Sequence, residues 1–311
     1  MMQCTIATRG SQLALWQANH IAALLRERHP GLEVPLLILK TTGDKILDVP
    51  LAKVGGKGLF VKEIEDALLD GRADLAVHSL KDVPAVLPAG LTLGVVPKRE
   101  EPVDVFLSVH FDSPADLPHG ATVGTSSLRR QAQLLALRPD AKIESLRGNL
   151  DTRVRKLLEG KYAAIVVAAA GLNRLGLTAP KRYVLGPPDF LPAVGQGALG
   201  LEYRENDERT AALVSFLDDP DSRDTAFAER GFLTGLDGGC QAPIAAHAVA
   251  VDSDTLRLTG LVADLTGERM IRREIVARRE TAREAGLALA RTVLDAGGKA
   301  IMDELYARAA D

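Results

Sequence analysis

A lysine and an aspartate stand next to each other after an apolar run, and their types and position suit chemistry. Residues 73–77 predict a buried strand, Lys81 and Asp82 follow it, and Pro84 ends the regular structure. In open α/β sheets, ligands bind outside the carboxyl ends of the strands. A carboxylate beside an ammonium keeps its charge and can stabilise a developing cation. A surface turn with a solvated Lys–Asp pair is the alternative, and the local sequence leaves both open.

Arginines recur in polar turns between a predicted strand and a predicted helix. These turns carry Arg9, Arg129 with Arg130, Arg147 with Arg153, and Arg174. Because the turns share one plan, we expect them to converge on one crevice. A convergent set of arginines favours a ligand with several carboxylates or phosphates.

The most specific of these turns spans residues 124–131. Thr125, Ser126 and Ser127 precede the two arginines, and either serine can cap the helix that follows. Free backbone N–H groups, hydroxyls and arginines at a helix N-terminus predict an anion site. A capped helix with solvated arginines is the alternative.

Two glycine-rich segments are similar to nucleotide-binding motifs, but the sequence does not support a nucleotide site in either. Residues 53–60, which include Lys53, Lys57 and Phe60, lack the Gly-Lys-Ser/Thr ending of a P-loop. They are interpreted either as a lid or turn or as a ligand contact. Residues 195–200 match Gly-x-Gly-x-x-Gly, but a strand rather than a helix is expected after them. We interpret this second segment as a return crossing to the first domain.

Cys240 is the cysteine most suited to chemistry, because Gly238 and Gly239 leave its thiol uncrowded. A reachable thiol can act as a nucleophile, whereas a lone cysteine is more often inert. Cys4, within a predicted strand, is expected to be inert. The six histidines show no metal-ligand spacing, so no metal site is expected.

The composition indicates a soluble globular protein. The chain has 311 residues, of which 46% are hydrophobic and 25% charged, with a net charge of −3. This balance argues against nucleic-acid binding, and no run reaches the length of a membrane span. The absence of a secretory signal and the presence of only two cysteines favour a reducing cytoplasm.

The order of predicted elements indicates an α/β fold with a hinged cleft between two domains, followed by a C-terminal α+β domain. Residues 5–8, 11–28 and 34–39 form a β-α-β unit, which implies parallel strands. Chain crossings are expected near 97–102 and 190–198. The predicted domains are residues 1–98 with 198–217, residues 99–197, and residues 218–311, the last carrying Cys240.

Together these segments resemble the porphobilinogen deaminase (hydroxymethylbilane synthase) family over nearly the whole chain. The segments that carry the resemblance are residues 7–17, 53–60, 78–84, 124–131, 146–149, 195–198 and 238–243. Each is weak alone, but their order is specific. Leu80 and Gln12 depart from residues common in the family, beside the proposed chemistry rather than within it.

The resemblance implies an enzyme that condenses four porphobilinogen molecules to hydroxymethylbilane and releases ammonia at each step. It also implies a dipyrromethane cofactor attached to Cys240 through a thioether, and two domains of the periplasmic-binding-protein type. Asp82 matches the catalytic aspartate, which would accept pyrrole N–H bonds, stabilise an azafulvenium cation and assist proton transfers. Cofactor-binding positions are Lys81, Asp82, Thr125, Ser126, Ser127, Arg129, Arg130 and Arg147. Substrate-binding positions are Arg9, Ser11, Gln17, Arg153 and Arg174, and cleft or lid positions are Lys53, Lys57, Phe60 and Gln196.

We expect a cytoplasmic monomer that binds a small-molecule substrate, without nucleic acid, membrane or metal. One rival hypothesis is a non-catalytic, two-lobed binding protein for an organic anion, which explains the arginines but not a reachable Cys240. A phosphate-binding enzyme is a weaker rival, because it needs a P-loop or metal pattern that we do not find.

Overall fold

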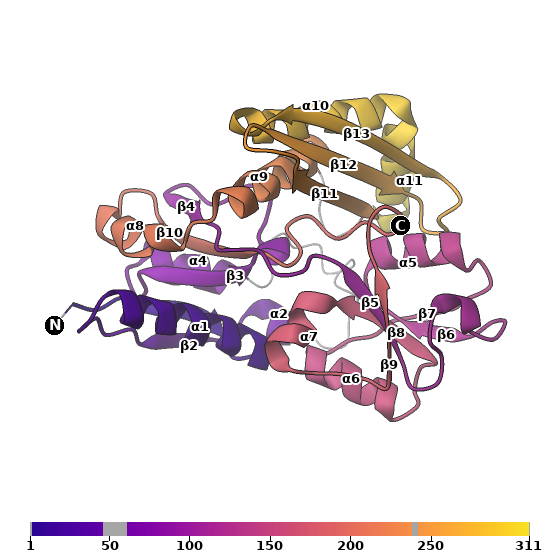
Figure 1. The fold of residues 1–311 in the computed structure, drawn as a ribbon, viewed down its shortest axis with the longest axis horizontal. Coiled ribbons are helices and arrows are strands. Elements are labelled where there is room, and N and C mark those ends of the chain that lie inside the picture. The colour runs from indigo at the N-terminus through magenta and orange to yellow at the C-terminus, as the bar shows by residue number, and fades with distance from the viewer. Residues whose placement is uncertain (1, 46–60, 238–241, 311) are drawn as a thin grey trace. The chain divides into compact units, whose positions relative to one another are not determined.

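The computed structural model describes residues 2–45, 61–237 and 242–310 (Figure 1). The chain divides into two compact units. Unit 1 comprises Met1–Glu100 and Gly197–Arg223, and unit 2 comprises Glu101–Gln196 and Asp224–Asp311. Each unit is described by itself. The three predicted domain ranges, and the cleft between the first two, stay predictions.

Unit 1 is built on a mixed five-stranded sheet with the order β2-β1-β3-β10-β4. β1 runs parallel to both β2 and β3, whereas β10 runs antiparallel to β3 and β4. The strands are β1 (Ile6–Arg9), β2 (Leu36–Leu39), β3 (Leu75–Ser79), β4 (Leu91–Val95) and β10 (Leu199–Arg204). The parallel β-α-β unit predicted at the N-terminus is confirmed, and so is the strand after the glycine-rich segment 195–198.

Helices cover both faces of this sheet, because alternate strand residues point to opposite sides. Ile6, Leu75 and Leu201 pack against α1 (Gln12–Arg28), whereas Ala7 and Ala76 pack against α4 (Lys62–Leu69). The remaining elements of unit 1 are α2 (Thr42–Lys45), η1 (Leu80–Asp82), α8 (Glu208–Val214) and η3 (Ser215–Leu217).

Unit 2 contains a second mixed five-stranded sheet, with the order β7-β6-β8-β5-β9. Its strands are β5 (Asp104–Ser108), β6 (Thr122–Gly124), β7 (Lys142–Glu144), β8 (Ala164–Ala168) and β9 (Lys181–Leu185). β6 runs parallel to β7 and β8, and each of these three strands leads into a helix, whereas β5 runs antiparallel to β8 and β9. These helices are α5 (Leu128–Leu137), α6 (Leu150–Leu158) and α7 (Ala169–Leu175); η2 (Pro114–Asp116) precedes β6.

The C-terminal part of unit 2 is a three-stranded antiparallel sheet with helices. The strands are β11 (Ile244–Ala250), β12 (Thr255–Ala263) and β13 (Met270–Arg278). The helices are α9 (Pro220–Gly235), η4 (Arg279–Thr281), α10 (Ala282–Val293), the π-helical turn η5 (Leu294–Gly298) and α11 (Lys299–Ala310). A Cβ atom on Gly231 would lie 2.2 Å from the backbone oxygen of Arg283, so α9 and the start of α10 approach at a distance that requires glycine.

The predicted fold class is therefore confirmed: the chain is α/β, with two mixed five-stranded sheets and a C-terminal antiparallel sheet with helices. The strand expected before residue 145 is present as β7, whereas the sequence analysis missed β9 and α8. None of the helices in the described ranges is long and apolar enough to cross a membrane.

Candidate functional site

A pocket in unit 1 brings together the residues predicted around Asp82. Its lining includes Arg9, Ser11, Gln17 and Asp82. Arg9 ends β1, and Asp82 lies in the 3₁₀ turn that follows β3, so both come from the carboxyl ends of parallel strands. Ser11 caps α1 by accepting a hydrogen bond from the backbone N–H of Ala14. The sheet edge thus places a cation, a hydroxyl and an exposed carboxylate around one hollow.

The wall of this pocket is fixed by a contact between α1 and β3. The side-chain amide of Gln17, which is buried, donates a 2.8 Å hydrogen bond to Oγ of Ser79. Ser79 ends β3 and precedes the turn that carries Lys81 and Asp82. Gln17 therefore also helps to position that turn.

The predicted anion site of unit 2 lies where β6 runs into α5. Ser127 is the N-cap of α5, and its hydroxyl accepts from the backbone N–H of Arg130. Oγ1 of Thr125 accepts from the backbone N–H of Ser127 at 3.2 Å. Ser126 is exposed, and its hydroxyl donates to the backbone oxygen of Leu146, in the turn after β7. The three hydroxyls thus order the turn; Ser126 is exposed, whereas Thr125 is buried.

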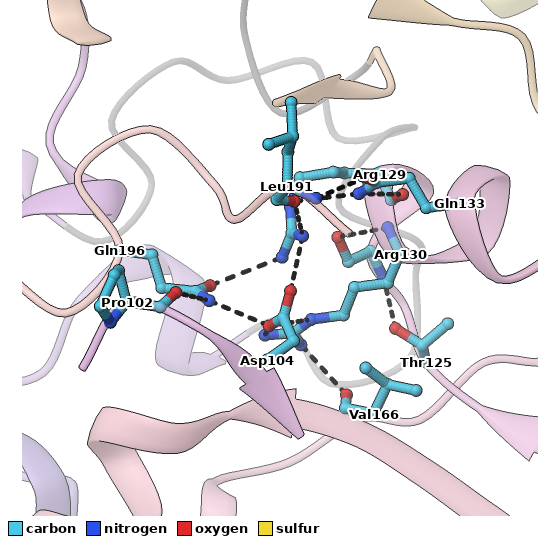
Figure 2. A network of polar contacts seen from close by, with 10 residues as sticks. Pro102, Asp104, Thr125, Arg129, Arg130, Gln133, Val166, Leu191 and Gln196 are labelled. Carbon is cyan, nitrogen blue, oxygen red and sulfur yellow. Dashed lines mark hydrogen bonds and ion pairs between the residues drawn. The ribbon is translucent and has the colours of Figure 1, made fainter. Parts of the chain in front are cut away.

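Arg129 and Arg130 converge on one buried carboxylate, Asp104, as Figure 2 shows. Nη1 of Arg129 lies 2.6 Å from Asp104, and Nη2 of Arg130 lies 2.7 Å from it. Asp104 has no exposed surface, and the two arginines are 5% and 6% exposed. Backbone oxygens accept further bonds, Leu191 from Arg129 and Val166 from Arg130. The two arginines are thus held rigidly rather than solvated.

The network carries an excess of positive charge within the described part of the chain, with one carboxylate for two guanidiniums. Burial alone would raise the pKa of Asp104, but the two arginines lower it to about 2. Burial also lowers the pKa of Arg129, against the opposing effect of Asp104. Nε of Arg129 has no hydrogen-bond partner among the described residues. Excess charge and a spare donor fit a carboxylate-bearing group.

Gln196, predicted as a cleft or lid residue, lies fully buried in the same network. Its side-chain amide donates to Oδ1 of Asp104 at 3.0 Å and to the backbone oxygen of Pro102 at 2.7 Å (Figure 2). The glycines on either side have φ angles of +69° and +86°, which other residues rarely adopt. Gly195 and Gly197 therefore allow the tight path that carries the Gln196 amide to Asp104.

The other arginines of unit 2 also follow the carboxyl ends of parallel strands. Arg147 lies in the turn between β7 and α6, and Arg174 lies on α7 after β8. Arg153, on α6, donates from Nε to the backbone oxygen of Gly148 at 2.8 Å. All three are partly exposed. The structure places these three arginines at the same end of one sheet, whereas their convergence with Arg9 stays a prediction.

Several predicted residues lie outside the described part of the chain. They are Cys240, Lys53, Lys57 and Phe60. Cys4 is buried, and burial raises the pKa of its thiol to about 12, which suits an inert side chain. Within the described ranges, no group of three or more histidine, cysteine or acidic side chains could hold a metal ion.

The sequence analysis missed two buried acids that support these sites. Asp104 organises the arginines of unit 2, and Glu202 on β10 lies 2.8 Å from His78, which lines the pocket of unit 1. Each acid stands within or at the start of an apolar strand. That pattern could have marked them, because a buried carboxylate needs a partner.

Solved structures similar to the chain are distant in sequence. A putative methionine-binding lipoprotein from Bacillus subtilis is 13% identical, with a TM-score of 0.42, over 69% of this chain and 89% of that one. The BenM effector-binding domain with its effector benzoate is 14% identical, also with a TM-score of 0.42, over 70% of this chain and 90% of that one. At these scores we draw nothing further from the likeness.

Sequence comparison is far more specific. Residues 4–212 match the domain described as "Porphobilinogen deaminase, dipyromethane cofactor binding domain", and residues 224–295 match "Porphobilinogen deaminase, C-terminal domain". The porphobilinogen deaminase of Maridesulfovibrio salexigens is 66% identical over 98% of this chain and 99% of that protein. That of Geobacter sulfurreducens is 52% identical over 97% of this chain and 95% of that protein. Members of the porphobilinogen deaminase (hydroxymethylbilane synthase) family are enzymes of tetrapyrrole biosynthesis that act on porphobilinogen and carry a dipyrromethane cofactor-binding domain. The two domain matches and the near-complete coverage show that the chain belongs to this family.

Proposed function

We propose that this chain joins four porphobilinogen molecules head to tail into hydroxymethylbilane, and that Asp82 is its catalytic carboxylate. The pocket of unit 1 carries the proposal, because it gathers Arg9, Ser11 and Asp82 at the carboxyl ends of two parallel strands. An exposed carboxylate at that position can reach a bound substrate. Arg9 and Ser11 offer donors for the acetate and propionate groups of a pyrrole.

Asp82 is proposed to stabilise positive charge as ammonia leaves. The departing amine takes the electrons of the carbon–nitrogen bond, and the pyrrole methylene that remains is cationic. A carboxylate next to the ring lowers the energy of that cation and accepts a hydrogen bond from the pyrrole N–H. The rigid turn after β3, which Gln17 and Ser79 support, keeps the carboxylate in place.

The cofactor is proposed to bind mainly in unit 2 through its carboxylates. When bound, the dipyrromethane supplies the terminal pyrrole carbon to which each new unit is joined. The excess positive charge of the Arg129–Arg130–Asp104 network fits its carboxylates. Further proposed cofactor contacts are Lys81, Asp82, Thr125, Ser126, Ser127 and Arg147. Cys240 is proposed to form the thioether that anchors the group.

Substrate carboxylates are proposed to meet a second set of residues. These are Arg9, Ser11, Gln17, Arg153 and Arg174, with Lys53, Lys57, Phe60 and Gln196 as proposed cleft or lid residues. Each added pyrrole brings two more carboxylates, so a cradle of arginines offsets charge that accumulates during the reaction.

We also propose that the enzyme is a cytoplasmic monomer of 33.2 kDa. The proposed functional residues all come from one chain, so no second copy is needed to complete the site. Porphobilinogen carries two carboxylates and an amine and crosses membranes poorly, so the enzyme is expected where its substrate is made. Light scattering on the purified protein and cell fractionation test the two statements separately.

The intact mass of the denatured protein tests the cofactor proposal. We expect an excess equal to two pyrrole units, which a Cys240→Ser variant loses. A bare chain mass that stays unchanged after incubation with porphobilinogen would contradict the proposal.

An Asp82→Asn variant tests the catalytic proposal. We expect it to keep the cofactor mass but to form product at least about 10²-fold more slowly, because the anion opposite the cation is gone. Asp70→Asn, which changes an exposed carboxylate in the same unit, should behave as wild type. Near-normal turnover by Asp82→Asn would remove it from the catalytic role.

A further inference from the structure

Three ionisable side chains are buried together in unit 1, and the proposed function uses none of them. His78 comes from β3, Glu202 from β10 and Glu65 from α4. Nε2 of His78 lies 2.8 Å from Oε2 of Glu202. His78 and Glu65 are each 6% exposed, and Glu202 has no exposed surface.

The sheet register brings these three residues together on one face. Glu202 pairs with Ala76 and Gly200 pairs with His78, so Glu202 and His78 share the face to which Ala76 points. Ala76 packs against α4, the helix that carries Glu65. The cluster therefore lies between α4 and the sheet.

The cluster holds more carboxylate than it can neutralise. Two glutamates and one imidazole are together neutral when they share two protons, and each proton lost leaves a buried negative charge. Burial, followed by the charge of Glu202, raises the pKa of Glu65 to about 7. His78 lowers it and Asp66 raises it further. One oxygen each of Glu65 and Glu202 has no hydrogen-bond partner among the described residues. Glu65 can thus exchange a proton near neutral pH.

His78 connects this cluster to the proposed reaction pocket. It lines the same pocket as Asp82, Arg9 and Ser11. Nε2 of the ring is engaged by Glu202, whereas Nδ1 has no hydrogen-bond partner in the part of the chain that the structure describes. The charged groups around the imidazole are thus Glu202 and Glu65 behind it and Arg9 and Asp82 in the pocket.

We propose that His78 is the base that removes the ring proton displaced at each condensation, with Glu202 and Glu65 as the residues that position it and hold its proton. When the new carbon–carbon bond has formed, the C–H bond at the same ring carbon breaks. Its electron pair restores the aromatic ring, and its proton moves to Nδ1 of His78. The proton then passes to the released ammonia, which leaves as ammonium, and the base is regenerated.

A second base also resolves a conflict in the role of Asp82. A carboxylate that took up the ring proton would lose the charge with which it stabilises the cation. Assigning the proton to His78 lets Asp82 remain an anion through the cycle. This inference rests on the proposed placement of the reaction in the Asp82 pocket.

A His78→Gln variant tests the assignment, because glutamine can keep a hydrogen bond to Glu202 but cannot take up the proton. We expect wild-type cofactor mass and turnover slower by about 10²-fold. Porphobilinogen with deuterium at its free α-carbon should show a larger isotope effect in this variant than in wild type, since loss of that hydrogen becomes rate-limiting. His29→Gln is the matched control, because His29 bonds the backbone oxygen of Leu213 away from the pocket.

The isotope effect gives a readout that a purely structural histidine would not change. A slower His78→Gln variant with the isotope effect of wild type would therefore overturn the proposal. So would His78→Gln with a wild-type rate and isotope effect while Asp82→Asn is inactive. If Asp82→Asn is active instead, the proposed function itself fails.

Discussion

Replacing Asp104 by asparagine keeps the shape of the side chain but removes the negative charge between Arg129 and Arg130. In the described part of the chain, no other carboxylate pairs with these arginines. We expect the Asp104→Asn variant to destabilise the five-stranded sheet of unit 2. We also expect it to hold the cofactor less well, because both arginines lose the group that orients them.

The geometry sets the size of the effect. Asp104 has no exposed surface, and the two guanidiniums that lie 2.6 and 2.7 Å from it are almost as fully buried. Removing one partner of a buried ion pair typically costs about 3–5 kcal/mol, because the remaining charge stays buried without compensation. Asparagine keeps one acceptor oxygen, which places our expectation near the lower value, about 3 kcal/mol.

Hydrogen exchange gives the most direct assay, because it reports on unit 2 by itself. Amides of α5 and β5 should lose protection in Asp104→Asn. Trp16, the single tryptophan, lies on α1 in unit 1. Its fluorescence should therefore report an unchanged unfolding transition of unit 1. Asp112→Asn is the matched control: Asp112 pairs with Lys181 at 2.7 Å but is exposed, so its loss should cost less than about 1 kcal/mol.

The pH dependence gives a second check with a defined sign. The folded-state pKa of Asp104 is lowered to about 2. Its stabilising contribution is therefore present above the unfolded pKa, near 4, and is lost as the pH falls through about 2. This part of the acid destabilisation should be missing from Asp104→Asn. The reasoning from the buried network is refuted if the free energy of unfolding of Asp104→Asn lies within about 1 kcal/mol of the wild-type value, which is the loss expected of the exposed control.

Two further predictions concern other buried acids. Glu65→Gln should increase the free energy of unfolding above about pH 7, by at most about 3 kcal/mol, and should lose this advantage below about pH 4.5. The sign follows because the pKa of Glu65 is raised, so the wild-type free energy of unfolding declines as the pH rises through about 7. Urea unfolding midpoints, followed by Trp16 fluorescence at both pH values, measure the difference between variant and wild type. Glu229 accepts hydrogen bonds from the backbone N–H groups of Gly195 and Ala248, at 2.7 and 2.9 Å. Because a glutamine side chain has one acceptor oxygen and can keep only one of these bonds, Glu229→Gln should destabilise unit 2 by about 1–3 kcal/mol. Exchange of these two amides should accelerate, and unchanged protection would contradict the assignment.

Most of the fold could be predicted because the spacing of apolar residues and the residues that start or end helices and strands agreed along the chain. The apolar spacing after Ser11 and the stop at Pro30 predicted α1 closely, and the serine caps the helix as expected. β9 was missed because its middle residues are exposed and it lies at a sheet edge, so it shows no apolar run.

The sequence predicted which turns carry the candidate site residues, but not how those residues are packed. Strand-end turns identified Asp82 and the serines before α5, because the carboxyl ends of strands are where open sheets bind ligands. The sequence could not show that Arg129 and Arg130 are buried against a common carboxylate. Both were expected to face a ligand outright, and the binding role of each stays a prediction.

The two buried acids that the sequence analysis missed share one property. Asp104 and Glu202 are acids in or at the start of apolar strands, where a charged group is stable only with a buried partner. Their partners lie 25 and 124 positions away in the sequence, at Arg129 and His78. An acid in a strand therefore predicts that a partner exists, whereas only the folded structure shows which one it is. In this chain helix α5 brings the two arginines of unit 2 to Asp104, and the register of β10 with β3 brings Glu202 to His78, the proposed base of the reaction pocket.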